Sequence, residues 1–417
     1  MNFNLNISEA KLKNYAKLLV VAGGNVQKGQ PVVIGSSVDN AFFARMVVDA
    51  AYDAGASEVA VWWNDDHVTL SNYLRAADET FDEYPKWAVD RYKHYDDKGV
   101  VYLFITSPNP DLLKDVDKDR IDRYSKVSSA ATKAHQGLRM NGDIRWSVVA
   151  LPSVAWAKKV FPELAEQDIS KAMNKLLDLL MTASRAVGDN PIDDWKKHNQ
   201  SFADKLNYLN GQQFTSLLIT TGLGTHLTIG LPQNHVWVGG GGKCKDGLLY
   251  LPNIPTEEIF TAPDKENVCG KVVASMPLSY QGNLVEDIEM EFANGVITSY
   301  NASKNKEILT NIISTDEGSK RLGEIAIVTN SSPISQMGTL FFNTLLDENA
   351  SAHLAIGKAY PKNIEGGTKM TPEQLEELGI NDSLVHVDFM FGTADLQIVG
   401  TRADGSEVVF FKDGEYV

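Results

Sequence analysis

Carboxylates and imidazoles in the C-terminal part of the 417-residue chain have the types and spacing of metal ligands. In the segment VHVDFMFG, side chains alternate between the two faces of a predicted strand. Val387 and Phe389 then share one face, while His386 and Asp388 share the other. A histidine and an aspartate two residues apart on a strand can bind one metal ion together. The alternative is a half-buried strand whose solvent face happens to carry both residues.

A second polar group lies in the segment 346–354, where Asp347, Glu348 and His353 are surrounded by apolar residues. Polar side chains need partners if such a segment is buried. A metal ion would provide one. The alternative is a capped helix start that carries a surface histidine.

Two further segments place glutamates beside apolar runs. In RLGEIAIV, Glu324 comes directly before a predicted strand, and Gly323 allows close backbone approach. In LPNIPTEEIFTAP, Glu257 and Glu258 lie between prolines in a stiff, extended loop. Adjacent like charges there are unfavourable unless a cation neutralises one or water screens both. Alone, each glutamate is more typical of a strand edge or of a solvated loop.

Together, Glu258, Glu324, His353, His386 and Asp388 supply three carboxylates and two imidazoles. This mixture suits Zn, Co or Mn, and it is too rich in nitrogen for a dedicated Ca or Mg site. One catalytic zinc needs about three protein ligands. Five ligands therefore favour two ions, with one carboxylate shared between metals ~3.5–4 Å apart.

Three other known motifs are absent or incomplete in this sequence. Gly222-Leu-Gly224 lacks the third glycine of a dinucleotide-binding loop. The run Gly239–Lys243 ends like a phosphate-binding loop, but Trp237 stands where the first glycine is needed and Cys244 where a Ser or Thr binds magnesium. No Gly-x-Ser-x-Gly occurs, so a hydrolase of the serine type has no nucleophile motif.

The first half of the chain predicts alternating strands and helices. Buried-strand patterns alternate with helical apolar spacing, which is typical of parallel βαβ units in a doubly wound sheet. The predicted strands are 31–36, 58–63, 100–107 and 145–153, and the predicted helices are 12–22, 41–54 and 118–136.

The second half changes character after two helical segments, 169–187 and 195–209. Short strand patterns follow at 271–274, 289–292, 325–329 and 384–391, and a final hairpin joins 396–402 to 407–412. The breaker at 188–191 separates the helical segments. We therefore predict an α/β chain: an N-terminal parallel-sheet domain, residues 1–188, and a strand-rich α+β domain, residues 189–417, that binds the metals.

Bulk properties narrow the class of protein. The formal net charge of -15 argues against a nucleic-acid binder, which needs a clustered basic surface. No run reaches the ~18 apolar residues of a membrane span. The N-terminus does not resemble a signal peptide, and two cysteines provide no disulfide framework. We expect a cytoplasmic protein with neither nucleic-acid nor membrane partners.

The sequence resembles a known family over essentially its whole length. The segments NIPTEEIFTAP, RLGEIAIV, LLDENASAHLAIGKAY and VHVDFMFG together resemble the aminopeptidase T, aminopeptidase S and peptidase S group of dinuclear metallo-aminopeptidases. The resemblance implies an aminopeptidase that releases N-terminal residues from short peptides with a free N-terminus. It also implies a homodimer that encloses its active sites, and an N-terminal domain that shapes access without contributing ligands.

The resemblance assigns roles to individual residues. The family's metal ligands fall on the five residues above, with Glu324 the most plausible bridge between the ions. The family's active-site tyrosine falls on Tyr360, which would donate a hydrogen bond to the oxyanion. Glu348 matches an acidic position and would carry a proton to the leaving amine. Without the resemblance, Tyr360 reads more simply as a core tyrosine.

Two other functions remain open on the residues alone. A phosphoesterase with the same metals would need a basic anchor, and the nearest candidates, Lys320, Arg321 and Lys358, lie in no phosphate-binding motif. A non-catalytic protein that binds a small molecule in its α/β half would leave the C-terminal acids as surface charge. Removal of His353 or His386 would then cause little loss of structure or function.

Overall fold

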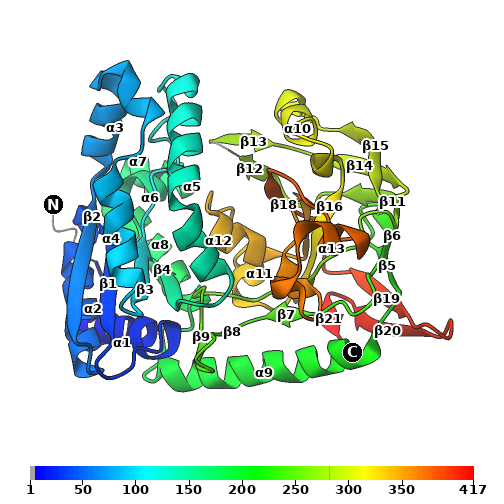
Figure 1. Ribbon diagram of the computed structural model, residues 1–417, viewed down its shortest axis with the longest axis horizontal. Helices are drawn as coiled ribbons and strands as arrows, with labels where there is room; N and C mark the ends of the chain where they lie inside the picture. Colours follow the sequence, from blue (N-terminus) through cyan, green and yellow to red (C-terminus); the bar gives the residue numbers. More distant parts are fainter. Residues whose placement is uncertain (1–4, 281) are drawn as a thin grey trace. The chain divides into compact units, whose positions relative to one another are not determined.

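The computed structural model describes residues 5–280 and 282–417, and the chain forms two compact units (Figure 1). Unit 1 comprises Met1–His198 and Gly241–Pro255, and unit 2 comprises Asn199–Gly240 and Thr256–Val417. Unit 1 thus includes a segment that returns from the second half of the chain. That residues 1–188 form a domain by themselves stays a prediction.

Unit 1 is built on a four-stranded parallel sheet in the order β2-β1-β3-β4. Each strand lies within a residue or a few of a predicted one, because short buried runs rich in Val and Ile favour interior parallel strands. The strands are β1 (Pro31–Ser37), β2 (Glu58–Asn64), β3 (Val101–Thr106) and β4 (Trp146–Ala150).

Helices cover both faces of this sheet, as a doubly wound fold requires. Apolar residues of α1 (Glu9–Leu18), α2 (Ala41–Asp53) and α8 (Ile169–Ala183) form one core with Val32 and Ile34. On the other face, α4 (Lys86–Asp96) and α5 (Lys118–Met140) pack over Val33 and Tyr102. The predicted parallel α/β half is therefore confirmed.

Unit 2 contains two larger antiparallel sheets. A five-stranded sheet has the order β18-β17-β16-β10-β7 and an eight-stranded sheet the order β15-β14-β11-β6-β5-β19-β20-β21. The first consists of β18 (His386–Met390), β17 (His353–Gly357), β16 (Leu322–Ile327), β10 (Ile259–Thr261) and β7 (Val238–Gly239). The second consists of β15 (Val296–Asn301), β14 (Glu289–Ala293), β11 (Val268–Val273), β6 (His226–Gly230), β5 (Ser216–Thr220), β19 (Gln397–Thr401), β20 (Glu407–Lys412) and β21 (Glu415–Tyr416).

The remaining elements are shorter pieces, apart from α9, which starts in unit 1 and ends in unit 2. They are α3 (Asp66–Arg75), α6 (Val154–Val160), α7 (Pro162–Gln167), α9 (Pro191–Gln212), α10 (Lys306–Ile313), α11 (Pro333–Met337), α12 (Thr344–Asp347) and α13 (Pro372–Glu377), with the small strands β8 (Gly242–Lys243), β9 (Leu249–Tyr250), β12 (Leu278–Tyr280) and β13 (Asn283–Val285). No helix in the described part of the chain is long and apolar enough to cross a membrane.

The core of unit 2 uses only one face of the five-stranded sheet. Ile325, Leu354 and Phe389 belong to the same apolar cluster as Leu217 and Ile229 of the eight-stranded sheet. Since side chains alternate along a strand, the neighbours of these residues project from the opposite face. That opposite face carries the metal-ligand candidates.

Candidate metal centre

Four adjacent segments of the five-stranded sheet bring together all five residues expected to bind metal. Glu258 immediately precedes β10, Glu324 lies in β16, His353 begins β17, and His386 and Asp388 lie in β18. Glu324, expected just before a strand, lies inside one whose residues are all buried. The predicted start of this strand was wrong. A carboxylate inside a buried strand is costly by itself, and only the structure shows that two histidines lie beside it.

The strand register leaves space for ions between these side chains. Ala355 pairs with Glu324 on one side and with Asp388 on the other, so the three form one row across the sheet. Directly paired residues of antiparallel strands project from the same face. His386 likewise pairs with Gly357. Small residues between the ligands keep this face of the sheet open.

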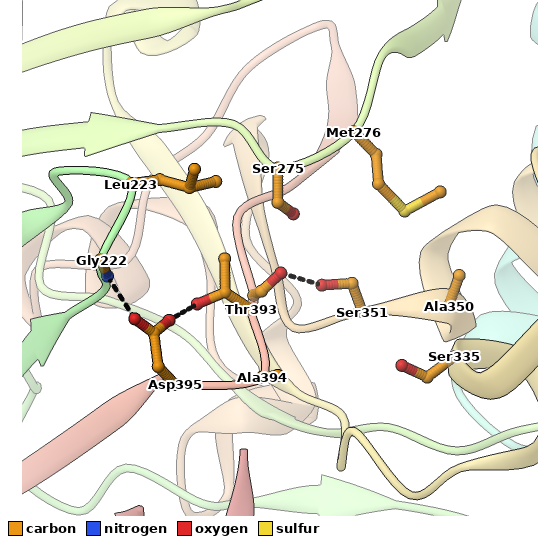
Figure 2. Close-up of a pocket in the computed structure, with 11 residues that line it drawn as sticks. Gly222, Leu223, Ser275, Met276, Ser335, Ala350, Ser351, Thr393, Ala394 and Asp395 are labelled. Carbon is orange, nitrogen blue, oxygen red and sulfur yellow. Dashed lines mark hydrogen bonds between the residues drawn. The ribbon is translucent and has the colours of Figure 1, made fainter. Parts of the chain in front are cut away.

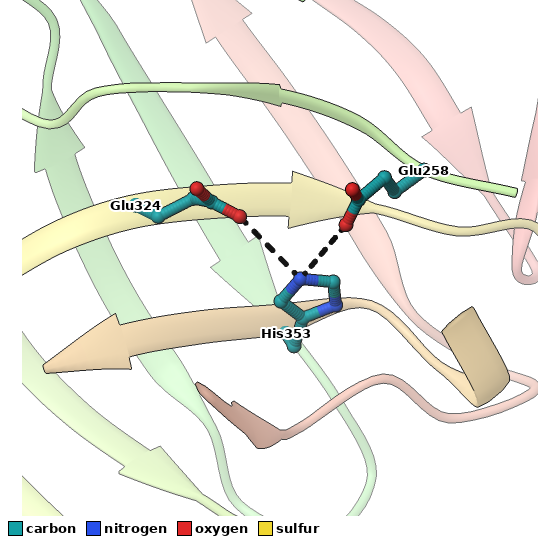
Figure 3. A group of neighbouring side chains, drawn as sticks. All are labelled: Glu258, Glu324 and His353. Carbon is teal, nitrogen blue, oxygen red and sulfur yellow. Dashed lines mark ion pairs between the residues drawn. The ribbon is translucent and has the colours of Figure 1, made fainter. Parts of the chain in front are cut away.

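The ligand atoms form two groups that share Glu324. In the first, His353 Nε2 lies 3.2 Å from Glu258 Oε2 and 3.5 Å from Glu324 Oε1 (Figure 3). In the second, His386 Nε2 lies 3.8 Å from Glu324 Oε2 and 3.3 Å from Asp388 Oδ1. Within each group the candidate atoms lie within 4.8 Å of one another. The two oxygens of Glu324 thus face different histidines, as a bridging carboxylate must.

Backbone carbonyls orient both imidazoles. His353 Nδ1 lies 3.1 Å from the carbonyl oxygen of Ser351, and His386 Nδ1 lies 2.6 Å from that of Lys358. A carbonyl accepts only from an N–H, so Nδ1 carries a proton and Nε2 is the nitrogen that faces the site, where a metal ion would take the place of a proton. This arrangement is typical of histidines that bind metal.

Two carboxylates of the site, Glu324 and Glu348, are electrostatically unfavourable without a cation, whereas the pKa of Asp388, which burial would raise, is lowered by His386. Burial raises the pKa of Glu324, and the charges of Glu258 and Asp388 raise it further, against a lowering by His353. Burial, followed by the charges of Glu258 and Asp388, raises the pKa of Glu348 well above its usual range. Groups that resist ionisation through burial and mutual repulsion need a compensating positive charge.

The donor set fits divalent ions. Asp388 Oδ1 is buried without a hydrogen-bond partner, although His386 Nε2 lies nearby. A buried carboxylate oxygen without a hydrogen bond is costly, and a metal ion shared with Nε2 of His386 would satisfy it. Two imidazoles with three carboxylates match borderline transition metals better than calcium or magnesium.

Metal affinity should rise with pH up to about 9. Burial alone would lower the pKa of His386, but Asp388 and Glu324 raise it to about 9; the pKa of His353 is also raised, by Glu258 and Glu324 against burial. Below these values the metal-free protein holds protons that a metal must displace, so the association constant increases about tenfold per pH unit for each proton released. Calorimetry at pH 7 in two buffers of different ionisation enthalpy measures that release. Metal binding with no proton release would contradict the expectation.

Tyr360 and Glu348, expected to take part in catalysis, both lie at this site. The Tyr360 ring centroid is 4.9 Å from that of His386. Burial, followed by the charges of Glu324 and Asp388, raises the pKa of the Tyr360 hydroxyl, which therefore keeps its proton. Glu348 follows α12 directly, and its pKa responds to four of the predicted ligands, Glu258, Asp388, His353 and Glu324.

Asn349 is a positioning residue that sequence patterns did not reveal. It is fully buried, accepts a hydrogen bond from the backbone N–H of Glu257 at 2.7 Å, and donates one to the carbonyl of Leu345 at 2.9 Å. It thereby ties the loop of Glu258 to the turn of Glu348. The only signal in the sequence was an asparagine next to a predicted site residue.

Asn349→Ala should weaken metal binding and lower stability. The change leaves a buried N–H without a partner, which costs about 1–3 kcal/mol, and it frees the loop that carries Glu258. Loss of a residue that positions a metal ligand typically lowers metal affinity 10–100-fold. Asn210→Ala is the matched control, because Asn210 bonds the backbone of Trp237 in the same way away from the site. Equal metal affinity in the two variants would refute the role of Asn349.

A separate cavity of about 410 Å³ lies next to the loop before His353 (Figure 2). Ser351 and Ala350 line it, together with Asp395. The Asp395 carboxylate already accepts from the backbone N–H of Gly222 at 2.9 Å and from the hydroxyl of Thr393. None of the five candidate ligands lines this cavity. The candidate metal centre is therefore separate from it and lies on the face of the five-stranded sheet.

Comparison with known proteins gives the same class. Residues 8–416 match the family model described as thermophilic metalloprotease (M29). Aminopeptidase AmpS of Bacillus subtilis is 43% identical over 97% of this chain and 98% of its own length, and aminopeptidase PepS of Streptococcus thermophilus is 40% identical over the same shares. The solved structure of wild-type AmpT from Thermus thermophilus superposes with a TM-score of 0.90 at 34% identity, covering 98% of this chain and 99% of that one.

The chain therefore belongs to the M29 family of metalloproteases. The predicted class, a metal-dependent aminopeptidase, is confirmed by the family and by the names of these relatives. The name peptidase S in the expected group was wrong, because PepS is an aminopeptidase. The mixed α/β fold class is confirmed by the match to AmpT. The alternatives of a small-molecule-binding protein or a phosphoesterase are not favoured.

Proposed function

We propose that this protein removes N-terminal residues from short peptides at a two-metal centre held by Glu258, Glu324, His353, His386 and Asp388. The observation that carries the proposal is the sharing of Glu324 between two groups of ligand atoms. Two divalent ions bound there would lower the pKa of a water molecule and polarise the scissile carbonyl. The protein's own residues supply orientation and proton transfer.

Glu348 and Tyr360 have complementary tasks in this proposal. The raised pKa of Glu348 suits a carboxylate that takes a proton from the attacking water and gives it to the leaving amine. The protonated hydroxyl of Tyr360 donates a hydrogen bond to the oxyanion that develops on the scissile carbonyl, a contribution of ~3 kcal/mol in comparable sites. Neither task requires these residues to bind metal.

Glu348→Gln separates a proton-transfer role from a ligand role. The amide keeps the size of the side chain but cannot exchange protons, so kcat should fall about 10²–10⁴-fold while the metal content stays that of the wild type. Steady-state kinetics with elemental analysis of the same sample measures both quantities. A variant that loses one metal ion would instead place Glu348 among the ligands.

The remaining features of the proposal follow from the chemistry of the site and the family. The ions are Zn, Co or Mn, as the mixture of imidazoles and carboxylates favours. The substrates carry a free N-terminus, whose amine can bind one ion. We further propose a cytoplasmic homodimer, with the N-terminal α/β half shaping access to the site.

Hydrolysis assays with controlled metal content test the function. Leucine p-nitroanilide and small dipeptides are incubated with the purified protein, after chelation, and after addition of Co, Zn or Mn. We expect activity that disappears on chelation, returns with metal, and is absent on N-acetylated substrates. Cleavage of N-acetylated substrates, or activity unaffected by thorough metal removal, would overturn the proposal.

A further inference from the structure

Lys362 lies on the same face of the five-stranded sheet as the metal-ligand candidates. Its ammonium is 4.6 Å from the ring centroid of Phe260 and 5.2 Å from that of Tyr360. Phe260 pairs with Ala326, which in turn pairs with His353, so Phe260 shares a row and a face with that histidine. The ammonium therefore lies over the face of the sheet that carries the metal-ligand candidates, beside the candidate metal centre.

The backbone that carries Lys362 is fixed. Lys362 lies in the short turn Pro361–Asn363, and the buried Asn363 side chain donates to the carbonyls of Val236 and Phe260 at 3.2 and 3.3 Å. This anchors the turn to β10, the strand that Glu258 precedes. Lys362 thus has a defined position relative to Glu258, although solvent still reaches its side chain.

Lys362 has no anionic partner of its own. In the part of the chain that the structure describes, it forms no ion pair with a carboxylate, and its ammonium lies over two aromatic rings. Although the residue is exposed, desolvation of its ammonium by the surrounding protein lowers the pKa, and the carboxylates of Glu324 and Glu258 oppose that shift. Once those carboxylates bind divalent cations, Lys362 faces positive charge and needs an anion from elsewhere.

We propose that Lys362 binds the free C-terminal carboxylate of a dipeptide substrate. The inference rests on the proposed function and specifies its substrate. Glu258 and Phe260 are two residues apart in an extended segment, with Cα atoms about 6.5 Å apart, and they project from the same face. Because the ammonium lies over the Phe260 ring, it is placed to meet a group that extends a short way beyond the metal centre. In a dipeptide whose scissile carbonyl lies at the metals, the terminal carboxylate follows one residue later. A longer peptide places a neutral amide there.

The test compares leucylglycine with leucylglycinamide and leucylglycylglycine on the metal-loaded enzyme. The wild-type protein should have a KM about 10-fold lower for leucylglycine than for the amide, which lacks the carboxylate at that position. Lys362→Met should remove this difference by raising only the KM for leucylglycine, with kcat unchanged. Lys362→Arg should restore part of it, and Lys369→Met, at an exposed lysine in the next turn, should leave it intact.

The other outcomes are separable. If Lys362→Met lowers kcat equally for all three substrates, Lys362 acts on the reacting carbonyl or supports the fold, and the inference fails while the proposed function stands. If the wild-type enzyme does not distinguish leucylglycine from its amide, the inference also fails. If the wild-type protein cleaves none of the three under any metal, the proposed function itself fails. Elemental analysis of the variant, expected to match the wild type, excludes an indirect effect through lost metal.

Discussion

Glu324→Ala is expected to reduce kcat/KM for peptides by well over 100-fold. Removal of a residue that only supports a metal ligand typically lowers metal affinity or activity 10–100-fold. Glu324 itself faces both groups of ligand atoms, so its removal should cost more. Loss of the shared carboxylate leaves each ion short of one ligand. The thermal stabilisation that Zn or Co gives the wild-type protein, which follows from binding to the folded state alone, should disappear in the variant.

A matched control separates this effect from a general change of charge. Glu291→Ala removes a carboxylate from β14, where the side chain is exposed, and should change neither metal content nor kinetics. Activity of Glu324→Ala within 10-fold of the wild type would mean that the ions, if bound, do not share this residue. The dependence of the melting temperature on metal concentration, compared between Glu324→Ala and the wild type, measures the loss of metal binding independently of activity.

Ala355→Leu is expected to abolish metal binding without preventing folding. Ala355 stands between Glu324 and Asp388 in the strand register, so a larger side chain would occupy the space between the two groups of ligand atoms. Extra methyl groups in a packed interior cost about 1–3 kcal/mol, which a protein of this size can tolerate. We expect a metal-free protein with native circular dichroism, a modestly lowered melting temperature, and activity reduced by more than about 100-fold.

Ala355→Gly provides the comparison by size. It keeps the face of the sheet open, and the expected cost is roughly 1 kcal/mol of stability with metal content retained. If Ala355→Leu bound metal as well as the wild type does, the ions could not lie on this face between β16 and β18. Elemental analysis of the folded fractions of both variants decides the point.

Much of the fold follows from local patterns in the sequence. The four parallel strands of unit 1 were predictable because each is a short apolar run bounded by turn residues. The pairing of His386 with Asp388 was predictable for the same reason, since alternation along a single strand places them together. These inferences need only residues that are neighbours in the chain.

What could not be predicted depends on contacts between distant segments. The register that sets Ala355 between Glu324 and Asp388 joins three strands, and no pattern in any one of them reveals it. The bond from Asn349 to the Glu257 backbone spans 92 residues. Lys362 reads as an ordinary surface lysine until Phe260 is known to lie beneath it. Tertiary geometry, and not residue type, gives these side chains their importance.

Anomalous diffraction from crystals grown with Zn tests the central claim most directly. A difference map at the zinc absorption edge locates each ion without reference to any assumed ligand. The account predicts two peaks, each bonded to one histidine and both bonded to the carboxylate of Glu324, at a separation of ~3.5–4 Å. A single peak, or two peaks of which either has no oxygen of Glu324 within bonding distance, would contradict the shared-carboxylate centre.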